Sequence, residues 1–168
     1  SVVAGQQFEY TFDDIGNRKT TGAGGDQYGA NLRSVTYSAN SLNQYSSRTV
    51  PGYLEVEGSA ATNAAVTVNL QATYRKGEYF RKELTADNSS GPVWQAITNI
   101  AVVPNGTNSD YVSTNTGNLL LAKASETFLH DSDGNLTSDS LWTNRWDGEN
   151  RLTSIESQSA VPTGAKVK

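Results

Sequence analysis

The sequence contains no cysteine and no methionine, and it has only one histidine and four prolines among its 168 residues. Without cysteine the chain can form no disulfide, no thiolate metal site and no cysteine nucleophile. No apolar run approaches the roughly 20 residues that a membrane-spanning helix needs. The first residues show no signal-peptide pattern. The net charge of −4 disfavours a nucleic-acid partner, because phosphate binding needs a basic patch.

Apolar residues are also scarce, at 36% of the chain, whereas serine, threonine, asparagine and glycine are abundant. This composition is typical of short strands joined by many turns, so it predicts an all-β fold in one domain or two small ones. The absence of methionine even at the first position favours a segment of a longer protein. The absence of cysteine suits an exported bacterial protein.

A short phrase of seven residues occurs three times in the chain. It consists of a ring, an aspartate, two variable residues, a glycine or asparagine, a polar or charged residue, and a leucine that is replaced by arginine in the N-terminal copy. The copies are Phe12–Arg18, His130–Leu136 and Trp146–Leu152. Residues 37–45 form a degenerate fourth copy that lacks the aspartate. Internal repeats of this kind decide an architecture, so they outweigh the other signals in the sequence.

Each copy of the phrase predicts a β-hairpin. The aspartate opens a turn by accepting hydrogen bonds from the backbone that follows it, and glycine or asparagine three residues later tolerates a positive φ. The predicted turn residues are Asp13, Gly16, Asp131, Gly134, Asp147 and Asn150. One hairpin alone is marginally stable in water. We therefore expect the N-terminal and C-terminal hairpins to pair in a twisted antiparallel sheet, with Tyr10 or Phe12 contacting residues 142–155.

The phrase resembles the YD repeat of RHS proteins and of the teneurins, whose pattern is Tyr-Asp-x-x-Gly-Asn/Arg-Leu. Here Phe12, His130 and Trp146 take the place of the tyrosine, and the resemblance covers residues 8–21 and 126–157. It implies a spiralling β-sheet that closes into a hollow shell. The expected function is a non-catalytic structural segment of a large exported bacterial RHS-repeat protein, located outside the cell or on its surface, with association with a toxin as one option. Its partners would be neighbouring repeats of the parent chain.

The middle of the chain lacks the phrase and shows strand-like alternation instead. We predict hairpins over residues 1–48, an inserted small β-sandwich over 49–104, and a linker strand with hairpins over 105–168, where 104–118 reads as a loop. The inserted segment resembles a bacterial Ig-like or carboxypeptidase-regulatory-like module. An alternative function is therefore an adhesion module that binds a carbohydrate or another surface protein through the sandwich. Trp94 and Tyr79 are the candidate binding residues, because exposed rings stack on sugars.

Other polar groups allow further readings. Asp131, Asp133, Asn135 and Asp139 present oxygen atoms near a glycine, as calcium loops do, but the turn already explains the pattern and no metal or cofactor is predicted. His130 with a neighbouring aspartate could act as a base, although it occupies the ring position of the repeat. Glu55 with Glu57 could suggest glycoside hydrolysis, yet this spacing also fits a solvated strand face. A cross-link between Lys76 or Lys82 and Asn99, promoted by Glu83, is left open.

Overall fold

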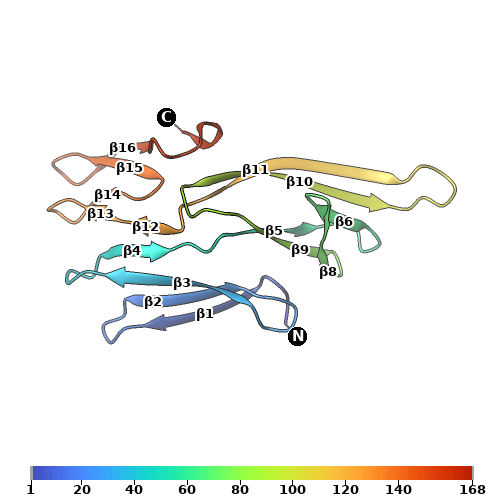
Figure 1. The fold of residues 1–168 in the computed structure, drawn as a ribbon, viewed down its shortest axis with the longest axis horizontal. Coiled ribbons are helices and arrows are strands. Elements are labelled where there is room, and N and C mark those ends of the chain that lie inside the picture. The colour runs from blue at the N-terminus through green and yellow to red at the C-terminus, as the bar shows by residue number, and fades with distance from the viewer. Residues whose placement is uncertain (1, 168) are drawn as a thin grey trace.

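The computed structural model describes residues 2–167, and it confirms that the chain is all-β (Figure 1). Among these residues the one helical element is a 3₁₀ turn, Thr163–Ala165, and no helix is long and apolar enough to cross a membrane. The strands are β1 (Gln7–Phe12), β2 (Arg18–Gly24), β3 (Leu32–Ala39), β4 (Tyr45–Thr49), β5 (Tyr53–Ser59), β6 (Ala65–Val68), β7 (Gln71–Ala72), β8 (Tyr74–Lys76), β9 (Tyr79–Thr85), β10 (Val93–Val103), β11 (Tyr111–Leu121), β12 (Ser125–Thr127), β13 (Leu129–His130), β14 (Leu136–Ser138), β15 (Trp142–Trp146) and β16 (Leu152–Ser157).

The hairpins from both ends of the chain join into one extended antiparallel sheet. A five-stranded part has the order β1-β2-β3-β4-β12, and a four-stranded part has the order β13-β14-β15-β16. Strands β12 and β13 are separated only by Phe128, whose N–H donates to the Ser46 carbonyl, so the two parts are continuous. Figure 1 shows this stack on the left, running from β1 at the bottom to β16 at the top.

The two ends of the chain therefore pair, as expected, but through different strands from those expected. Strand β12 pairs with β4, with Glu126 opposite Arg48. Strands β1 and β16 lie at opposite edges of the extended sheet, so the expected contact of Tyr10 or Phe12 with residues 142–155 is wrong. The strand that returns from the middle segment meets β4 first, because β4 is where the first hairpins end.

The middle of the chain forms a β-sandwich. A three-stranded sheet, β5-β9-β8, packs on a four-stranded sheet, β11-β10-β6-β7. Alternation places one side of each strand inward, and these inward apolar residues make the main core, which is Leu54, Val56, Ala64, Val66, Val68, Phe80, Leu84, Ile97 and Leu121. The core arises because each sheet has one apolar face to bury.

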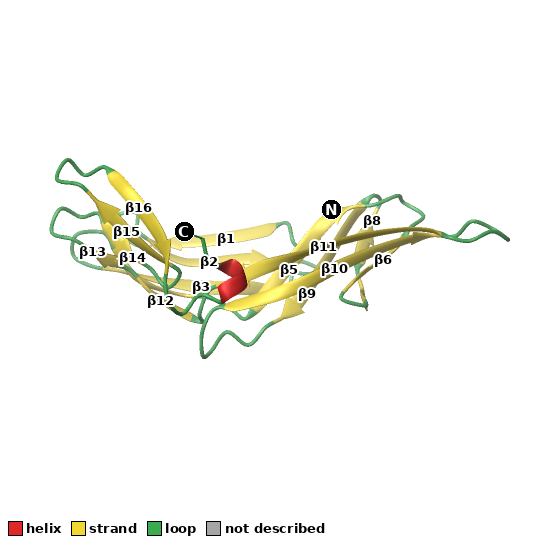
Figure 2. Cartoon of the chain, turned by 90° about the horizontal axis from the view of Figure 1, so that it is seen from above, coloured by secondary structure: helices red, strands yellow, loops and turns green. Residues whose placement is uncertain are grey.

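The sandwich extends further along the chain than the predicted boundary at residue 104. Residues 111–121, most of which read as a loop, form β11 and pair with β10 over its whole length, from Val93 opposite Leu121 to Val103 opposite Tyr111. The sequence signal is weak because residues 111–118 are exposed on both faces of the sheet and lack apolar alternation. Figure 2 shows this β10–β11 hairpin reaching beyond the rest of the sandwich.

Candidate functional site: stacked turns, seam and groove

The Asp131 turn shows what the repeated phrase does. The Asp131 N–H donates to the Asn135 carbonyl, and the Gly134 N–H donates to the Asp131 carbonyl. One carboxylate oxygen of Asp131 accepts the N–H groups of Asp133 and Asn135, at 3.0 and 2.9 Å. The other accepts the Asn135 side-chain amide at 3.1 Å. Gly134 has a φ of 89°, a conformation that only glycine and asparagine adopt readily.

The same backbone and side-chain hydrogen bonds recur at five turns of the chain. In each, an aspartate or asparagine at the first position accepts the N–H groups of the third and fifth residues, and the fourth residue has a positive φ. The first and fourth residues of these turns are Asp13 and Gly16, Asp26 and Gly29, Asn40 and Asn43, Asp131 and Gly134, and Asp147 and Asn150.

Two of these turns differ from the sequence-based reading. In the degenerate copy Asn40 accepts the turn hydrogen bonds that an aspartate accepts in the other copies. Ala39 stands where the other copies have an aromatic residue before the turn, and the aromatic residue Tyr45 lies on the strand after the turn, paired with Ala39. The turn at Asp26, between β2 and β3, was missed because no ring precedes it. Its signal was present nonetheless, since Asp26 and Gly29 have the three-residue spacing that all five turns share.

Four of the turns lie at one side of the sheet (Figure 1), and side-chain hydrogen bonds join them in two pairs. The Asn17 side-chain amide donates to Asn43 Oδ1 of the next turn at 3.2 Å. The Asn135 amide likewise donates to Asn150 Oδ1 at 2.8 Å. In both pairs the fifth residue of one turn donates to the fourth residue of the next. The repeat thus encodes a lateral bond between hairpins as well as each turn.

These hydrogen bonds change the acidity of the turn aspartates. The Asn17 side-chain amide is the main cause that lowers the pKa of Asp13 below its ordinary value of 3.8. The Arg151 backbone N–H does the same for the pKa of Asp147, helped by the Arg151 guanidinium. Hydrogen bonds from Asn135 outweigh burial and lower the pKa of Asp131. Each carboxylate is therefore bound to the turn in its charged form.

One face of the sheet carries a line of rings and guanidinium groups across β1 to β4. The Arg18 guanidinium lies 5.0 Å from the Tyr10 ring centre and 5.7 Å from that of Tyr37. Tyr37 in turn contacts Tyr45, with ring centres 5.3 Å apart. At the β1 edge this face is uncovered, since Phe8 is 57% and Phe12 56% exposed. An uncovered apolar surface on an edge strand is suited to contact with another element.

A buried ion pair closes the seam between β4 and β12. Glu126 is 1% exposed, and its carboxylate accepts hydrogen bonds from Arg48 and, at 2.6 Å, from the Ser140 hydroxyl. Burial by itself lowers the pKa of Arg48, but the bond to Glu126 outweighs it and leaves that pKa raised. The pair therefore links the first hairpins to the last.

Asn88 holds the two crossings between the sheet and the sandwich together. Its side-chain amide donates to the Val50 carbonyl at 3.1 Å and to the Ala122 carbonyl at 2.8 Å, and Asn88 is 4% exposed. Its own carbonyl accepts the Ala124 N–H. Val50 precedes the sandwich and Ala122 follows it. Nothing in the local sequence distinguishes Asn88 from the loop residues around it, so sequence reasoning missed this role.

The outer face of β5 and β9 rests on the N-terminal segment rather than on solvent. Tyr79 Oη lies 2.8 Å from the Ala4 carbonyl oxygen and 2.9 Å from Glu57 Oε1. Burial, together with the neighbouring Glu57 carboxylate, raises the pKa of Tyr79 to about 12. Glu55 pairs with Arg81. The two glutamates thus hold the N-terminal segment and a guanidinium, which is a structural role.

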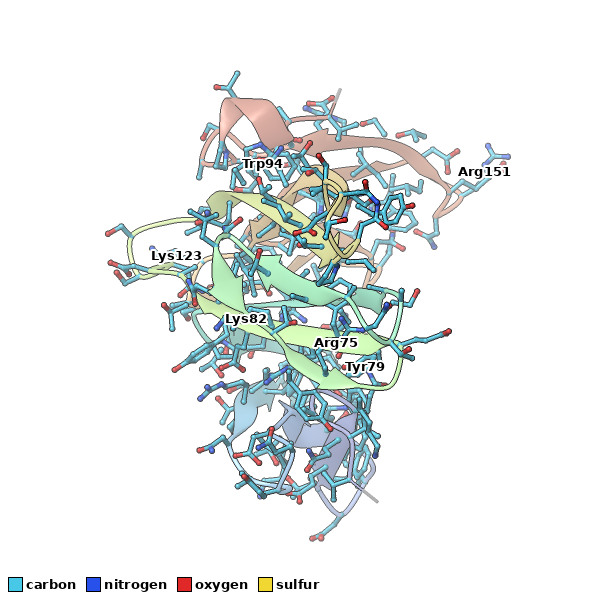
Figure 3. The ribbon with its side chains drawn as sticks, turned by 90° about the vertical axis from the view of Figure 1, so that its right-hand side faces the viewer. Arg75, Tyr79, Lys82, Trp94, Lys123 and Arg151 are labelled. Atoms are coloured by element: carbon cyan, nitrogen blue, oxygen red, sulfur yellow. The ribbon has the colours of Figure 1, made fainter. Side chains whose placement is uncertain are left out.

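Trp94 and Tyr79, the predicted sugar-binding residues, belong to different sheets of the sandwich (Figure 3). Tyr79 faces the N-terminal segment, as described above. Trp94 is half-buried, and the C-terminal turn lies against its indole, where a side chain on Gly164 would meet Trp94 Nε1 at 2.8 Å. The structure does not bring the two rings together into a stacking platform.

The other candidate groups are also occupied or dispersed. Asp139 Oδ1 accepts the Leu141 and Trp142 N–H groups, in a turn separate from that of Asp131. No group of three potential metal-binding side chains occurs within residues 2–167. His130 takes the ring position opposite Leu136. Glu83 is engaged by Arg33 and Arg81 on the outer face of β9.

The largest hollows of the sandwich form one open groove between β5 and β11. Three adjoining hollows, of about 420, 290 and 240 Å³, are each lined by β5 and β11 residues or their immediate neighbours. Their floor includes the core residues Val66, Phe80 and Ile97. Asn99 also lines the groove, and its buried Oδ1 has no hydrogen-bond partner within the described residues. The sandwich is therefore open along this side.

Comparison of the chain with protein-family models, with curated proteins and with solved structures finds no match.

Proposed function

We propose that the chain is a non-catalytic structural segment of a large exported RHS-type bacterial protein, in which its hairpins form part of a shell or surface scaffold outside the cell or on its surface. The observation that carries this proposal is the ladder of stacked turns. Asn17 binds Asn43, and Asn135 binds Asn150, through the same pair of turn positions. A bond that joins one hairpin to a neighbouring one can be repeated as hairpins are added.

The edges of the sheet support the same proposal. Strand β1 pairs with β2 alone and β16 with β15 alone in the described part of the chain, so each presents unpaired main-chain groups. Exposed Phe8, Tyr10 and Phe12 lie on one face of β1. Natural sheets usually protect such edges. Neighbouring repeats of a parent chain would cover both the edge and the rings.

The reading frame that encodes the chain provides the direct test. We expect it to continue with further phrases of Asp-x-x-Gly or Asp-x-x-Asn at hairpin spacing, on at least one side of the sequence. An open reading frame of ordinary single-domain length would contradict the proposed scaffold function, because a shell needs many repeats to close. In the isolated chain, a dye that binds apolar surface should bind less strongly after Phe8→Thr with Phe12→Thr, while Ile15→Thr in the exposed turn serves as the control.

The alternative function is an adhesion module, and the groove favours the form of it that binds another protein. Its walls are strand edges, and its lining mixes core residues with polar ones, which suits an extended polypeptide that can pair with a strand edge. A glycan array separates the two ligand classes. Binding to a glycan that is lost on Trp94→Ala or Tyr79→Ala, with the fold intact, would support carbohydrate recognition instead.

A further inference from the structure

Strand β11 is an unprotected sheet edge. It has 11 residues, and within residues 2–167 it pairs only with β10. Its sequence, YVSTNTGNLLL, contains no charged residue and no proline, which are two of the features with which natural proteins protect an edge against pairing. Tyr111 and Val112 are 67% and 62% exposed. The edge therefore offers a long row of free main-chain donors and acceptors.

An open groove adjoins this edge on the side of β5. It lies between two edge strands, β5 and β11, and core residues line it. Strand addition satisfies main-chain groups and places alternate side chains in a groove of this form. The chain itself contains one long, exposed and uncharged strand of that kind, which is β11.

We propose that two copies of the chain associate through β11, which pairs antiparallel with β11 of the second copy about a two-fold axis at Asn115. This self-complementary arrangement is the commonest form of homodimer. It places Thr114 opposite Thr116 of the second copy, and cross-strand threonine pairs are favourable. It also places Tyr111 opposite Leu119 of the second copy, at the end of the groove where Gly117 leaves open space.

The register also extends a row of amides across the interface. Asn99 lies opposite Asn115 in the β10–β11 pair, so both side chains lie on the inward face. In the dimer, Asn115 of the second copy continues this row, followed by its Asn99. Rows of asparagine side chains across paired strands form amide hydrogen bonds. In a single copy Asn115 is the last amide of this row, and the dimer gives it a neighbouring amide in Asn115 of the second copy.

Because the chain has no cysteine, a single introduced cysteine tests the register. Asn115→Cys places two thiols directly opposite each other, so mild oxidation should give a disulfide-linked dimer. Glu9→Cys on the β1 edge is the matched control and should cross-link far more slowly. Equal or faster cross-linking of the control would overturn the proposal, because association would then run through the hairpin sheet.

Sedimentation equilibrium of the unmodified chain should give twice its 18.0 kDa mass. The variant carrying both Thr114→Lys and Thr116→Lys places like charges opposite each other at two positions. We expect it to dissociate about ten-fold more readily, since each charged pair costs up to about 1 kcal/mol. Its melting temperature when monomeric should match that of the unmodified chain. A monomeric unmodified chain, or a dimer unaffected by the two lysines, would refute the interface. Neither result bears on the reading-frame test of the scaffold.

Discussion

Arg48 and Glu126 are 78 residues apart in the sequence, yet they form the ion pair that joins the first hairpins to the last. The sandwich accounts for most of that separation, and it leaves and rejoins the sheet at this seam. A contact between residues so far apart carries a large loop-closure cost. Favourable interactions at the seam offset this cost: the buried Glu126 carboxylate, the β4–β12 pairing and the hydrogen bonds of the Asn88 amide.

Breaking the Arg48–Glu126 pair should destabilise the whole fold. Glu126→Gln leaves Arg48 without its charged partner, and we expect a loss of about 3 kcal/mol, the low end for a buried pair, because the Arg48 side chain is 39% exposed. Chemical denaturation measures the change. The double variant Arg48→Met with Glu126→Leu should be more stable than Glu126→Leu alone, because it removes the unpaired guanidinium. Simple additivity in this cycle would show that the pair does not interact.

Removing the Asn88 side chain should loosen both crossings between sheet and sandwich. Asn88→Ala leaves the Val50 and Ala122 carbonyls without their donor, which we expect to cost about 2 kcal/mol. Hydrogen exchange should rise at Ala124, whose N–H donates to the Asn88 carbonyl. Ser89→Ala, in the same loop but exposed, is the control. Equal effects of the two substitutions would contradict the special role of Asn88.

Gly134 should tolerate a β-branched side chain poorly. Its φ of 89° is costly for such residues, so Gly134→Val is expected to lower stability by about 1–3 kcal/mol. Gly148 provides the control, because it lies in the equivalent type of turn without a positive φ, and a side chain there meets nothing within 4 Å. Thermal melts of Gly134→Val and Gly148→Val should differ. Similar melting temperatures would show that Gly134 does not need its left-handed conformation.

Acid should destabilise the hairpin sheet through the turn aspartates. Asp13, Asp26, Asp131 and Asp147 have pKa values below the ordinary 3.8. A lowered pKa in the folded state contributes stability above pH 3.8, and this contribution is lost as the pH falls through the folded-state value. Melting temperatures should therefore drop in that range. Asp131→Asn should reduce the drop yet keep the turn, because Asn40 already serves in that role. An unchanged acid profile in this variant would count against the explanation.

Tyr79 should ionise later than an ordinary tyrosine. Burial and Glu57 raise its pKa to about 12, from an ordinary value of 10.0. A raised pKa means that the contribution of Tyr79 to stability is complete below pH 10 and is lost as the pH rises towards 12. Ultraviolet titration of the eight tyrosines should show a late component that Tyr79→Phe removes. A titration that is the same with and without Tyr79 would contradict the contacts to Ala4 and Glu57.

The turns could be predicted from the sequence because all their hydrogen bonds lie within five residues. An aspartate followed three residues later by glycine or asparagine specifies the turn almost regardless of its surroundings, as Asp13, Asp131 and Asp147 show. The same local rule identifies the turn at Asp26, once the requirement for a preceding ring is dropped. The all-β class follows from many such turns between short strands.

The tertiary structure alone decided which strands meet. Residues 111–118 form a strand because β10 supplies their hydrogen-bond partners, although their polar, exposed sequence reads as a loop. Glu126 is buried because β4, the last strand before the sandwich, pairs with the strand that follows it. The sequence predicts Trp94 and Tyr79 alike as candidate binding rings on strands, yet the C-terminal turn covers Trp94 and the N-terminal segment covers Tyr79. Burial and long-range pairing depend on the packing of distant segments, and a pattern confined to neighbouring residues does not contain that information.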